Sequence, residues 1–167
     1  MAPYTADDVR KVVFSIGDLK APGPDGLHAI FFKKYWGILG DEITQEVLFA
    51  INRRQIPEEW NDTSIVLIPK VDSPELITQY RPISLCNVLY KIASKVIANR
   101  LKKILPDIIS EEQSVFVLGR LITDNIICAY ECLHFMKRNK SKYYSFFALK
   151  QDMMKAYDRL EWSYLRA

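Results

Sequence analysis

The fold of this chain is decided by the stretch Thr63-Ser64-Ile65-Val66-Leu67-Ile68-Pro69-Lys70, which carries the strongest strand signal in the sequence. β-Branched residues dominate its centre, as is typical of strands. A polar turn region from Val71 to Thr78 follows, and then comes Tyr80-Arg81-Pro82-Ile83-Ser84-Leu85, which predicts a second short strand. Two strands joined by one turn region predict a β-hairpin.

Helices are predicted on both sides of the hairpin. The first should run from Asp7 to Leu19, because Thr5 is a good N-cap and Asp8 stands at the third position of a capping box. Its apolar face is expected at Val9, Val12, Val13 and Ile16. Further helices are predicted over 27–36, 41–54, 87–104, 121–137 and within 152–167, and a strand is predicted over 142–150. This order of elements predicts an α+β fold.

The composition is that of a single globular domain. The chain has 167 residues, of which 49% are hydrophobic and 26% charged, and its net charge is +3. Such a charge permits a polyanionic partner without requiring one. No apolar run is long enough to span a membrane, and residues 1–8 do not resemble a secretory leader.

The three cysteines indicate a reducing, intracellular compartment. An odd number of cysteines without a secretory leader favours free thiols. Cys128, Cys132 and His134 could suggest a zinc site, but the two cysteines lie within a predicted helix and no second ligand pair exists. We therefore predict no zinc site and expect both cysteines on a buried helical face.

One carboxylate stands at a position where enzymes often hold a metal ion. The predicted strand ending at Lys150 leads into Gln151-Asp152, and a helix follows. A carboxylate at the end of a strand is held rigidly enough to bind Mg²⁺. From the spacing alone, the commoner interpretation of Asp152 is a turn or cap residue.

Two cations stand on the predicted hairpin. Lys70 follows Ile68-Pro69 and Arg81 precedes Pro82, so both belong to adjacent strands. Directed the same way, they would suit a triphosphate, to which an arginine adds bidentate geometry. Without further information, two solvated surface charges are the commoner interpretation.

Several motifs together resemble those of reverse transcriptases from LINE-type (non-LTR) retrotransposons, particularly the plant versions. The motifs occur in the family's order and cover nearly the whole chain. They are Lys20-Ala21-Pro22-Gly23-Pro24-Asp25-Gly26, Ile68-Pro69-Lys70, Tyr80-Arg81-Pro82-Ile83-Ser84-Leu85, Tyr90-Lys91-Ile92, Asn99-Arg100-Leu101, Gln113-Ser114-Val115-Phe116, Gly119-Arg120, Asp124-Asn125-Ile126 and 149–158.

The resemblance implies a role for each matching residue. Asp152 matches the first catalytic aspartate of the palm, which would bind two Mg²⁺ ions. Tyr157 matches the aromatic residue beneath the incoming sugar, and Lys70 and Arg81 match residues that hold the nucleotide's phosphates. The implied reaction is RNA-templated DNA synthesis from dNTPs onto a DNA primer, and the nucleus is one compartment that the family suggests. Asp158 also matches the motif, but a capping interaction with Glu161 explains it without catalysis.

In that family's terms the chain is predicted to be a partial, truncated reverse transcriptase domain of the right-hand polymerase fold. Residues 1–139 would form the fingers region, and residues 140–167 the first palm strand, the catalytic motif and the following helix. The Pro-Gly-Pro-Asp-Gly loop would lie near the template, although physical reasoning supports only a rigid turn. The lysines of the predicted helix 87–104 either follow a phosphate backbone or form the wet face of that helix.

The sequence departs from the family at a functionally important place. Reverse transcriptases carry a second carboxylate pair, Tyr-x-Asp-Asp, downstream of the first aspartate, and these 167 residues contain none. The only Asp-Asp, Asp7-Asp8, belongs to the first helix. We therefore expect this polypeptide alone to lack polymerase activity. Departures at Val115, Leu118, Gln151 and Met153-Met154 fit a copy no longer under selection. The alternatives are a non-enzymatic nucleic-acid-binding remnant and a retroelement relic without function.

Overall fold

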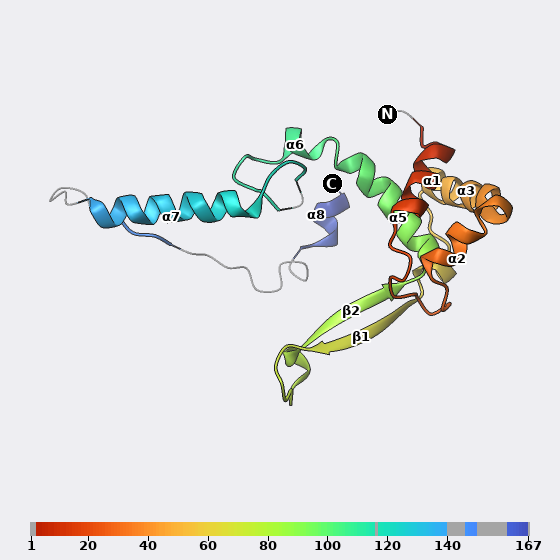
Figure 1. The fold of residues 1–167 in the computed structure, drawn as a ribbon, viewed down its shortest axis with the longest axis horizontal. Coiled ribbons are helices and arrows are strands. Elements are labelled where there is room, and N and C mark those ends of the chain that lie inside the picture. Colours follow the sequence, from red (N-terminus) through yellow and green to blue (C-terminus); the bar gives the residue numbers. More distant parts are fainter. Residues whose placement is uncertain (1–2, 116, 140–145, 150–159, 167) are drawn as a thin grey trace. The chain divides into compact units, whose positions relative to one another are not determined.

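The computed structural model describes residues 3–115, 117–139, 146–149 and 160–166. It divides into two compact units, Met1–Ile108 and Ile109–Ala167, and each is described by itself. The first unit combines helices with a hairpin, which confirms the predicted α+β class (Figure 1). The finer division into residues 1–139 and 140–167 stays a prediction.

The first unit has six α-helices, one 3-10 helix and two strands among its described residues. In chain order they are α1 (Ala6–Ser15), α2 (Ala29–Lys34), α3 (Trp36–Arg53), α4 (Glu58–Asn61), β1 (Thr63–Pro69), η1 (Ile77–Gln79), β2 (Tyr80–Cys86), α5 (Val88–Leu101) and α6 (Leu105–Ile108). Helices α1, α2, α3 and α5 pack around one hydrophobic core.

Helix α1 begins with the predicted capping box. The backbone N–H of Asp8 donates to Thr5 Oγ1 at 3.3 Å, and the backbone N–H of Thr5 donates to Asp8 Oδ2 at 3.0 Å. Both unpaired N–H groups therefore find an acceptor at the helix start. The helix ends at Ser15 rather than at Leu19, because Ile16 adopts an extended conformation and Gly17 follows it.

The core confirms the predicted apolar face of α1. All four of its expected residues are buried, and they meet apolar side chains from the neighbouring helices. The core consists of Val9, Val12, Val13, Ile16, Ala29, Phe32, Ile43, Val47, Ala50, Trp60, Val88, Ile92, Ala93 and Val96. Burial of this apolar surface is the main stabilising term of the unit.

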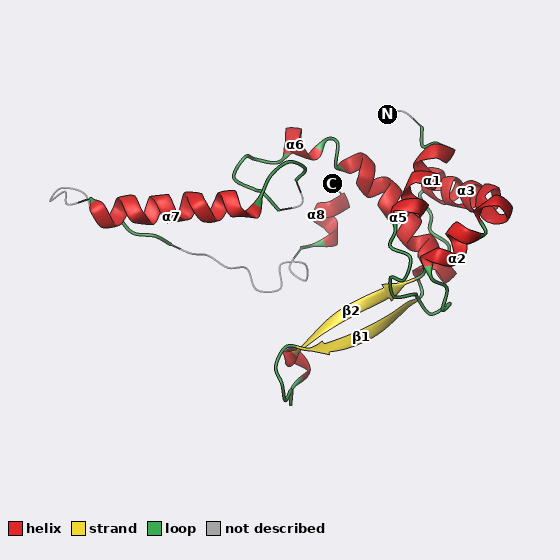
Figure 2. Cartoon of the chain, viewed as in Figure 1, coloured by secondary structure: helices red, strands yellow, loops and turns green. Residues whose placement is uncertain are grey.

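The hairpin formed by β1 and β2 confirms the prediction from the sequence. The strands are antiparallel, and the register pairs Thr63 with Cys86 and Pro69 with Tyr80. At the root Thr63, Leu85 and Cys86 are half-buried, at the tip Tyr80 is half-buried, and the middle of both strands is exposed. The hairpin extends away from the helices of its own unit (Figures 1 and 2).

Other helix ends differ from the predicted ones. Helix α3 starts at Trp36 instead of position 41, and the ring of Trp36 lies against Gly40 within the same helix. Helix α5 ends at Leu101, before the predicted end at Ile104. Pro106, which follows that end, lies inside the separate short helix α6. A proline is tolerated in the first turn of a helix, because no intrahelical N–H bond is lost there.

The second unit contains α7 (Ile122–Arg138) and α8 (Trp162–Arg166) among its described residues. Helix α7 confirms the predicted helix over 121–137, but none of its side chains is buried. Cys128 and Cys132 are exposed, so the expectation of a buried face is wrong for both. No helix in the described ranges is long and apolar enough to cross a membrane.

The strand predicted over 142–150 is not found where the structure describes it. Residues 146–149 have no regular secondary structure, and the other positions lie outside the described residues. A strand needs a neighbour to satisfy its backbone hydrogen bonds, and the only strand pairing among the described residues joins β1 to β2. The aromatic composition that suggested a strand instead brings Phe146 edge-on to Phe135 of α7.

Candidate functional site

The structure brings Lys70 and Arg81 to one face of the hairpin. Arg81 lies opposite Ile68 in the register, and directly opposed residues share a face. The backbone N–H of Lys70 donates to Gln79 O at 2.8 Å, so the pairing continues one residue past β1. Lys70 is two residues from Ile68 and therefore lies on the same face as Arg81. Both side chains are exposed.

The turn next to this pair is held by hydrogen bonds. Lys70 Nζ donates to Thr78 O at 3.0 Å, which positions the ammonium group at the tip of the hairpin. The side chain of Gln79 accepts from the backbone N–H groups of Glu75 at 2.6 Å and Leu76 at 2.9 Å. These bonds order the tip without covering the cationic face.

The root of the hairpin is joined to the helices through Asn87, the residue between β2 and α5. Its side chain is 9% exposed, and its Nδ2 donates to Glu59 O in α4 at 2.9 Å. Its Oδ1 accepts from the backbone N–H of Asp25 at 3.4 Å. Sequence reasoning missed this residue, because an asparagine before a helix usually indicates only an N-cap.

The loop 20–26 forms the predicted turn, in which the backbone N–H of Gly26 donates to Gly23 O at 3.1 Å, and the structure shows what the loop contacts. The backbone N–H of Leu27 donates to Asp25 Oδ1 at 3.1 Å, and Gly26 has a φ of 69°. Gly23 lies directly against the backbone of Cys86 and Asn87. The loop therefore packs onto the junction between β2 and α5.

Three cations of α5 make contacts inside the unit. Lys91 Nζ donates to Ala21 O at 2.7 Å, and Lys95 Nζ donates to Ser15 O at 3.1 Å. Arg100 donates to Pro3 O at 3.1 Å and stacks on the ring of Tyr4. Burial, with a smaller repulsion from neighbouring lysines, lowers the pKa of Lys95. The structure thus gives these three side chains a structural role within the unit, and both interpretations of the helix's lysines stay predictions.

Comparison with known proteins shows which family this chain belongs to. The family model described as "Reverse transcriptase (RNA-dependent DNA polymerase)" matches residues 68–166, a range that includes both hairpin cations. The chain belongs to the reverse transcriptase family. Its family match begins in β1 and extends to the end of α8.

Known relatives of this reverse transcriptase domain are proteins of transposable elements. A Xenopus laevis protein named "Transposon TX1 uncharacterized 149 kDa protein" is 34% identical over 98% of the chain and 12% of its own length. The Pol polyprotein of the type-1 retrotransposable element R1 from Bradysia coprophila is 27% identical over 93% of the chain and 15% of its own length. The probable RNA-directed DNA polymerase from transposon BS of Drosophila melanogaster is 26% identical over 95% of the chain and 17% of its own length.

These relatives support the non-LTR type of reverse transcriptase that the motifs suggested. The chain spans between 12% and 17% of their lengths, so it corresponds to a small part of each. The resemblance to plant versions stays a prediction. Reverse transcriptases are metal-dependent nucleotidyltransferases that act on a nucleic-acid template and dNTPs.

The remaining predicted site residues of the reverse transcriptase domain lie outside the described part. These are Asp152 and Tyr157, together with Asp158 of the same motif. Across residues 3–115, 117–139, 146–149 and 160–166, no group of three or more His, Cys, Asp or Glu side chains could hold a metal ion. The described residues therefore contain no such cluster, and of the predicted site residues they include Lys70 and Arg81, which share one face of the hairpin.

Two further motifs of the reverse transcriptase domain hold a loop in the second unit. Arg120 donates to the carbonyl oxygens of Ser110, Gln113 and Ile109. Asn125 Nδ2 donates to Glu112 O at 3.1 Å. These hydrogen bonds to backbone carbonyl groups indicate that the two motif residues order the segment before α7.

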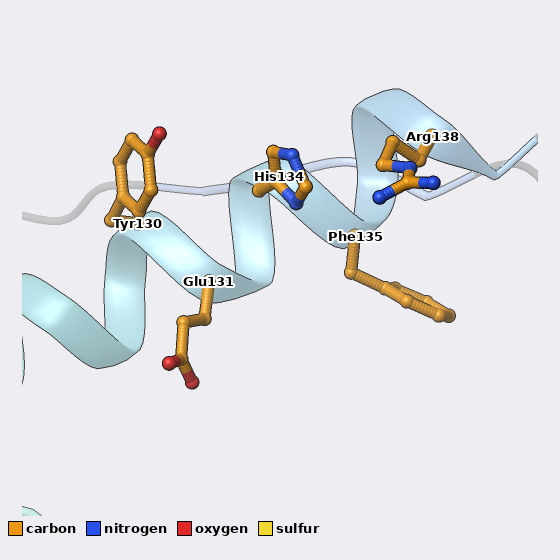
Figure 3. A pocket seen from close by; sticks show the side chains of 5 residues that line it. All are labelled: Tyr130, Glu131, His134, Phe135 and Arg138. Atoms are coloured by element: carbon orange, nitrogen blue, oxygen red, sulfur yellow. The ribbon is translucent and has the colours of Figure 1, made fainter.

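A shallow hollow lies on α7 in the second unit. Figure 3 shows its lining residues Tyr130, Glu131, His134, Phe135 and Arg138, all from this one helix. The rings of Tyr130 and His134 are stacked with centroids 6.2 Å apart.

Proposed function

We propose that this chain supplies the nucleotide-binding hairpin and the first catalytic carboxylate of a non-LTR retrotransposon RNA-directed DNA polymerase. The observation that carries the proposal is the common face of Lys70 and Arg81 on an exposed hairpin. The substrates would be dNTPs, an RNA template and the 3′-hydroxyl of a DNA primer. In this proposal residues 1–139 belong to the fingers and residues 140–167 to the start of the palm.

The two cations are suited to different parts of one triphosphate. Arg81 has a planar guanidinium that can donate two parallel hydrogen bonds to phosphate oxygens. Lys70 adds a compact charge at the tip, where its ammonium group already lies near a carbonyl oxygen. Together they would neutralise the phosphates and fix their orientation while the nucleotide is bound.

The proposal extends to two residues by their match to the family motif. Asp152 would hold Mg²⁺, two ions in the intact family, and Tyr157 would lie beneath the incoming sugar. The metal would supply charge neutralisation at the reacting phosphate. Because the described residues form no metal site, we derive no step through the ion.

The hairpin's role can be tested by photo-cross-linking the chain to a photoreactive dNTP at increasing concentrations. Arg81→Ala should raise the half-saturating concentration by about ten- to a hundredfold, because a charge-assisted hydrogen bond contributes about 1.5–3 kcal/mol. Arg81→Lys should give an intermediate value, since it keeps the charge and loses the bidentate geometry. Arg10→Ala and Lys11→Ala, on the exposed face of α1, are matched charge controls. Equal labelling in the Arg81 variants and the controls would contradict the proposal.

A second test addresses the proposed carboxylate. Primer extension on an RNA template with Mg²⁺ and dNTPs compares the chain with Asp152→Ala. Because the 167 residues contain no Tyr-x-Asp-Asp, we expect neither polypeptide to extend the primer. Extension that disappears in Asp152→Ala would overturn this expectation of inactivity and would support the role of Asp152. Salt-sensitive RNA binding without any dNTP labelling would favour the nucleic-acid-binding alternative.

A further inference from the structure

The side chain of Asn87 does not do what its position suggests. Asn87 is the N-cap residue of α5, where an asparagine normally accepts a hydrogen bond from the first turn of its own helix. Its side chain makes no such bond to α5. The amide is instead used for contacts with two other segments, and it is almost completely buried at 9% exposure.

Those contacts join the segments that meet at the root of the hairpin. Nδ2 donates at 2.9 Å to Glu59 O in α4, the helix that leads into β1. Oδ1 accepts at 3.4 Å from the N–H of Asp25 in the loop 20–26. Asn87 itself directly follows β2. One side chain therefore connects the entry of the first strand, the exit of the second strand and the loop beside them.

The fit at this junction is close. A Cβ atom added at Gly23 would lie 2.1 Å from Asn87 Oδ1 and 2.4 Å from its backbone nitrogen. The loop backbone thus rests directly on the asparagine. Beyond the half-buried root, the strand residues are exposed on both faces as far as Tyr80, which is half-buried at the tip. The direction of the hairpin must therefore be set mainly at its root.

We infer that Asn87 is a positioning residue, which holds the hairpin in the direction that presents Lys70 and Arg81 to a nucleotide. This inference rests on the proposed function, because it takes the cationic face as the binding surface. Loss of the two tertiary bonds would let the hairpin pivot at its root. Only a fraction of molecules would then be ready to bind, and the apparent affinity would fall by that fraction.

The direction of the hairpin can be measured without any nucleotide. Spin labels are attached at Ser73→Cys in the tip and Gln45→Cys on α3, both exposed, in the full chain with Cys86→Ala, Cys128→Ser and Cys132→Ser. We expect a narrow distribution of distances between the labels in this parent. Asn87→Ser should broaden it, because serine cannot make both tertiary bonds; serine is an equally good N-cap residue, so the start of α5 is not weakened. Ser94→Ala removes a hydrogen bond within α5 alone and is the matched control.

The nucleotide readout separates positioning from general loss of structure. Using the same photoreactive dNTP, Asn87→Ser should raise the half-saturating concentration by roughly three- to tenfold and leave the labelling at saturation unchanged. Irreversible unfolding would lower the labelling at saturation instead, whereas reversible unfolding would raise the half-saturating concentration only in proportion to the loss of folded fraction. Thermal melting of each variant identifies the folded fraction.

The outcomes distinguish failure of the inference from failure of the proposed function. If the distance distribution in Asn87→Ser is as narrow as in the parent, the inference is overturned. A broad distribution in the parent also overturns it, and this second test does not require any Asn87 variant to fold. If Asn87→Ser broadens the distribution while Arg81→Ala leaves dNTP labelling unchanged, Asn87 positions the hairpin but the proposed nucleotide site is wrong. A broadened distribution with weaker labelling in both variants supports both.

Discussion

Pro69 and Pro82 lie on opposite outer edges of the hairpin, one on each strand. The backbone N–H of Lys70 donates to Gln79 O, which makes this a hydrogen-bonded position of the ladder, and such positions alternate with non-hydrogen-bonded ones along antiparallel strands. The pairs of Pro69 with Tyr80 and of Pro82 with Leu67 are therefore non-hydrogen-bonded. At these positions the backbone N–H would point outward, so neither proline removes a bond from the ladder.

We expect these prolines to limit edge-to-edge association of the exposed hairpin. Each removes an outward N–H donor, and prolines at sheet edges oppose pairing with another chain. Ile65 is 66% exposed and would add apolar contact to such a pairing. The double variant Pro69→Ala/Pro82→Ala should self-associate more strongly in light scattering at increasing concentration. Pro74→Ala in the turn is the control, and equal association of both variants would contradict the prediction.

The capping box of α1 should give the unit an acid-sensitive stability. Hydrogen bonds from the backbone and side chain of Thr5 lower the pKa of Asp8, and Arg100 lowers it further. Because the folded pKa lies below the unfolded one of about 4, the stability from Asp8 is present above that pH. It is lost as the pH falls through the folded pKa.

Denaturation with urea at several pH values measures this contribution. The chain should be more stable than Asp8→Asn at neutral pH, and the difference should shrink as the pH falls below about 4. Thr5→Ala should cost about 1 kcal/mol at neutral pH, because it removes the N-cap acceptor. Asp41→Asn is the control for loss of an exposed charge on α3. If the free energies of unfolding of the chain and of Asp8→Asn differ by the same amount at every pH, the role of the carboxylate is contradicted.

Two isoleucines of α5 should respond differently to the same substitution. Ile92 is completely buried in the core, whereas Ile97 is 43% exposed on the same helix. Ile92→Ala should cost about 2–5 kcal/mol, because it leaves a cavity among packed side chains. Ile97→Ala should change the free energy of unfolding by about 0.5 kcal/mol or less. Similar losses in both variants, measured by urea denaturation, would show that the core is not where the structure places it.

Local signals in the sequence were sufficient for the hairpin and for the start of α1. The β-branched run around Val66 and the pairing of Thr5 with Asp8 each contain the physical cause of their structure within a few neighbouring residues. The common face of Lys70 and Arg81 also follows from the strand period once the register is known. Such features need no knowledge of distant contacts.

Features that depend on distant contacts were missed or wrongly predicted. Asn87 is separated from Asp25 by 62 positions, and nothing in the sequence near Asn87 indicates their hydrogen bond. The exposure of Cys128 and Cys132 depends on what packs against α7, and helical spacing alone does not determine it. The lysines of α5 presented the same difficulty, because their carbonyl acceptors belong to other segments.

Two glycines provide the sharpest test of the junction beside the hairpin. An added Cβ at Gly23 would meet the backbone of Asn87 and Cys86 at 2.4 and 2.6 Å, so the loop or the strand end would have to move. Gly23→Ala should therefore cost about 1–3 kcal/mol, as overpacking of a close contact does. Gly37 lies in α3 with no atom within 4 Å of an added Cβ, and Gly37→Ala should stabilise by about 0.5 kcal/mol. Urea denaturation measures both, and a Gly23→Ala variant as stable as Gly37→Ala would show that the loop does not rest on Asn87.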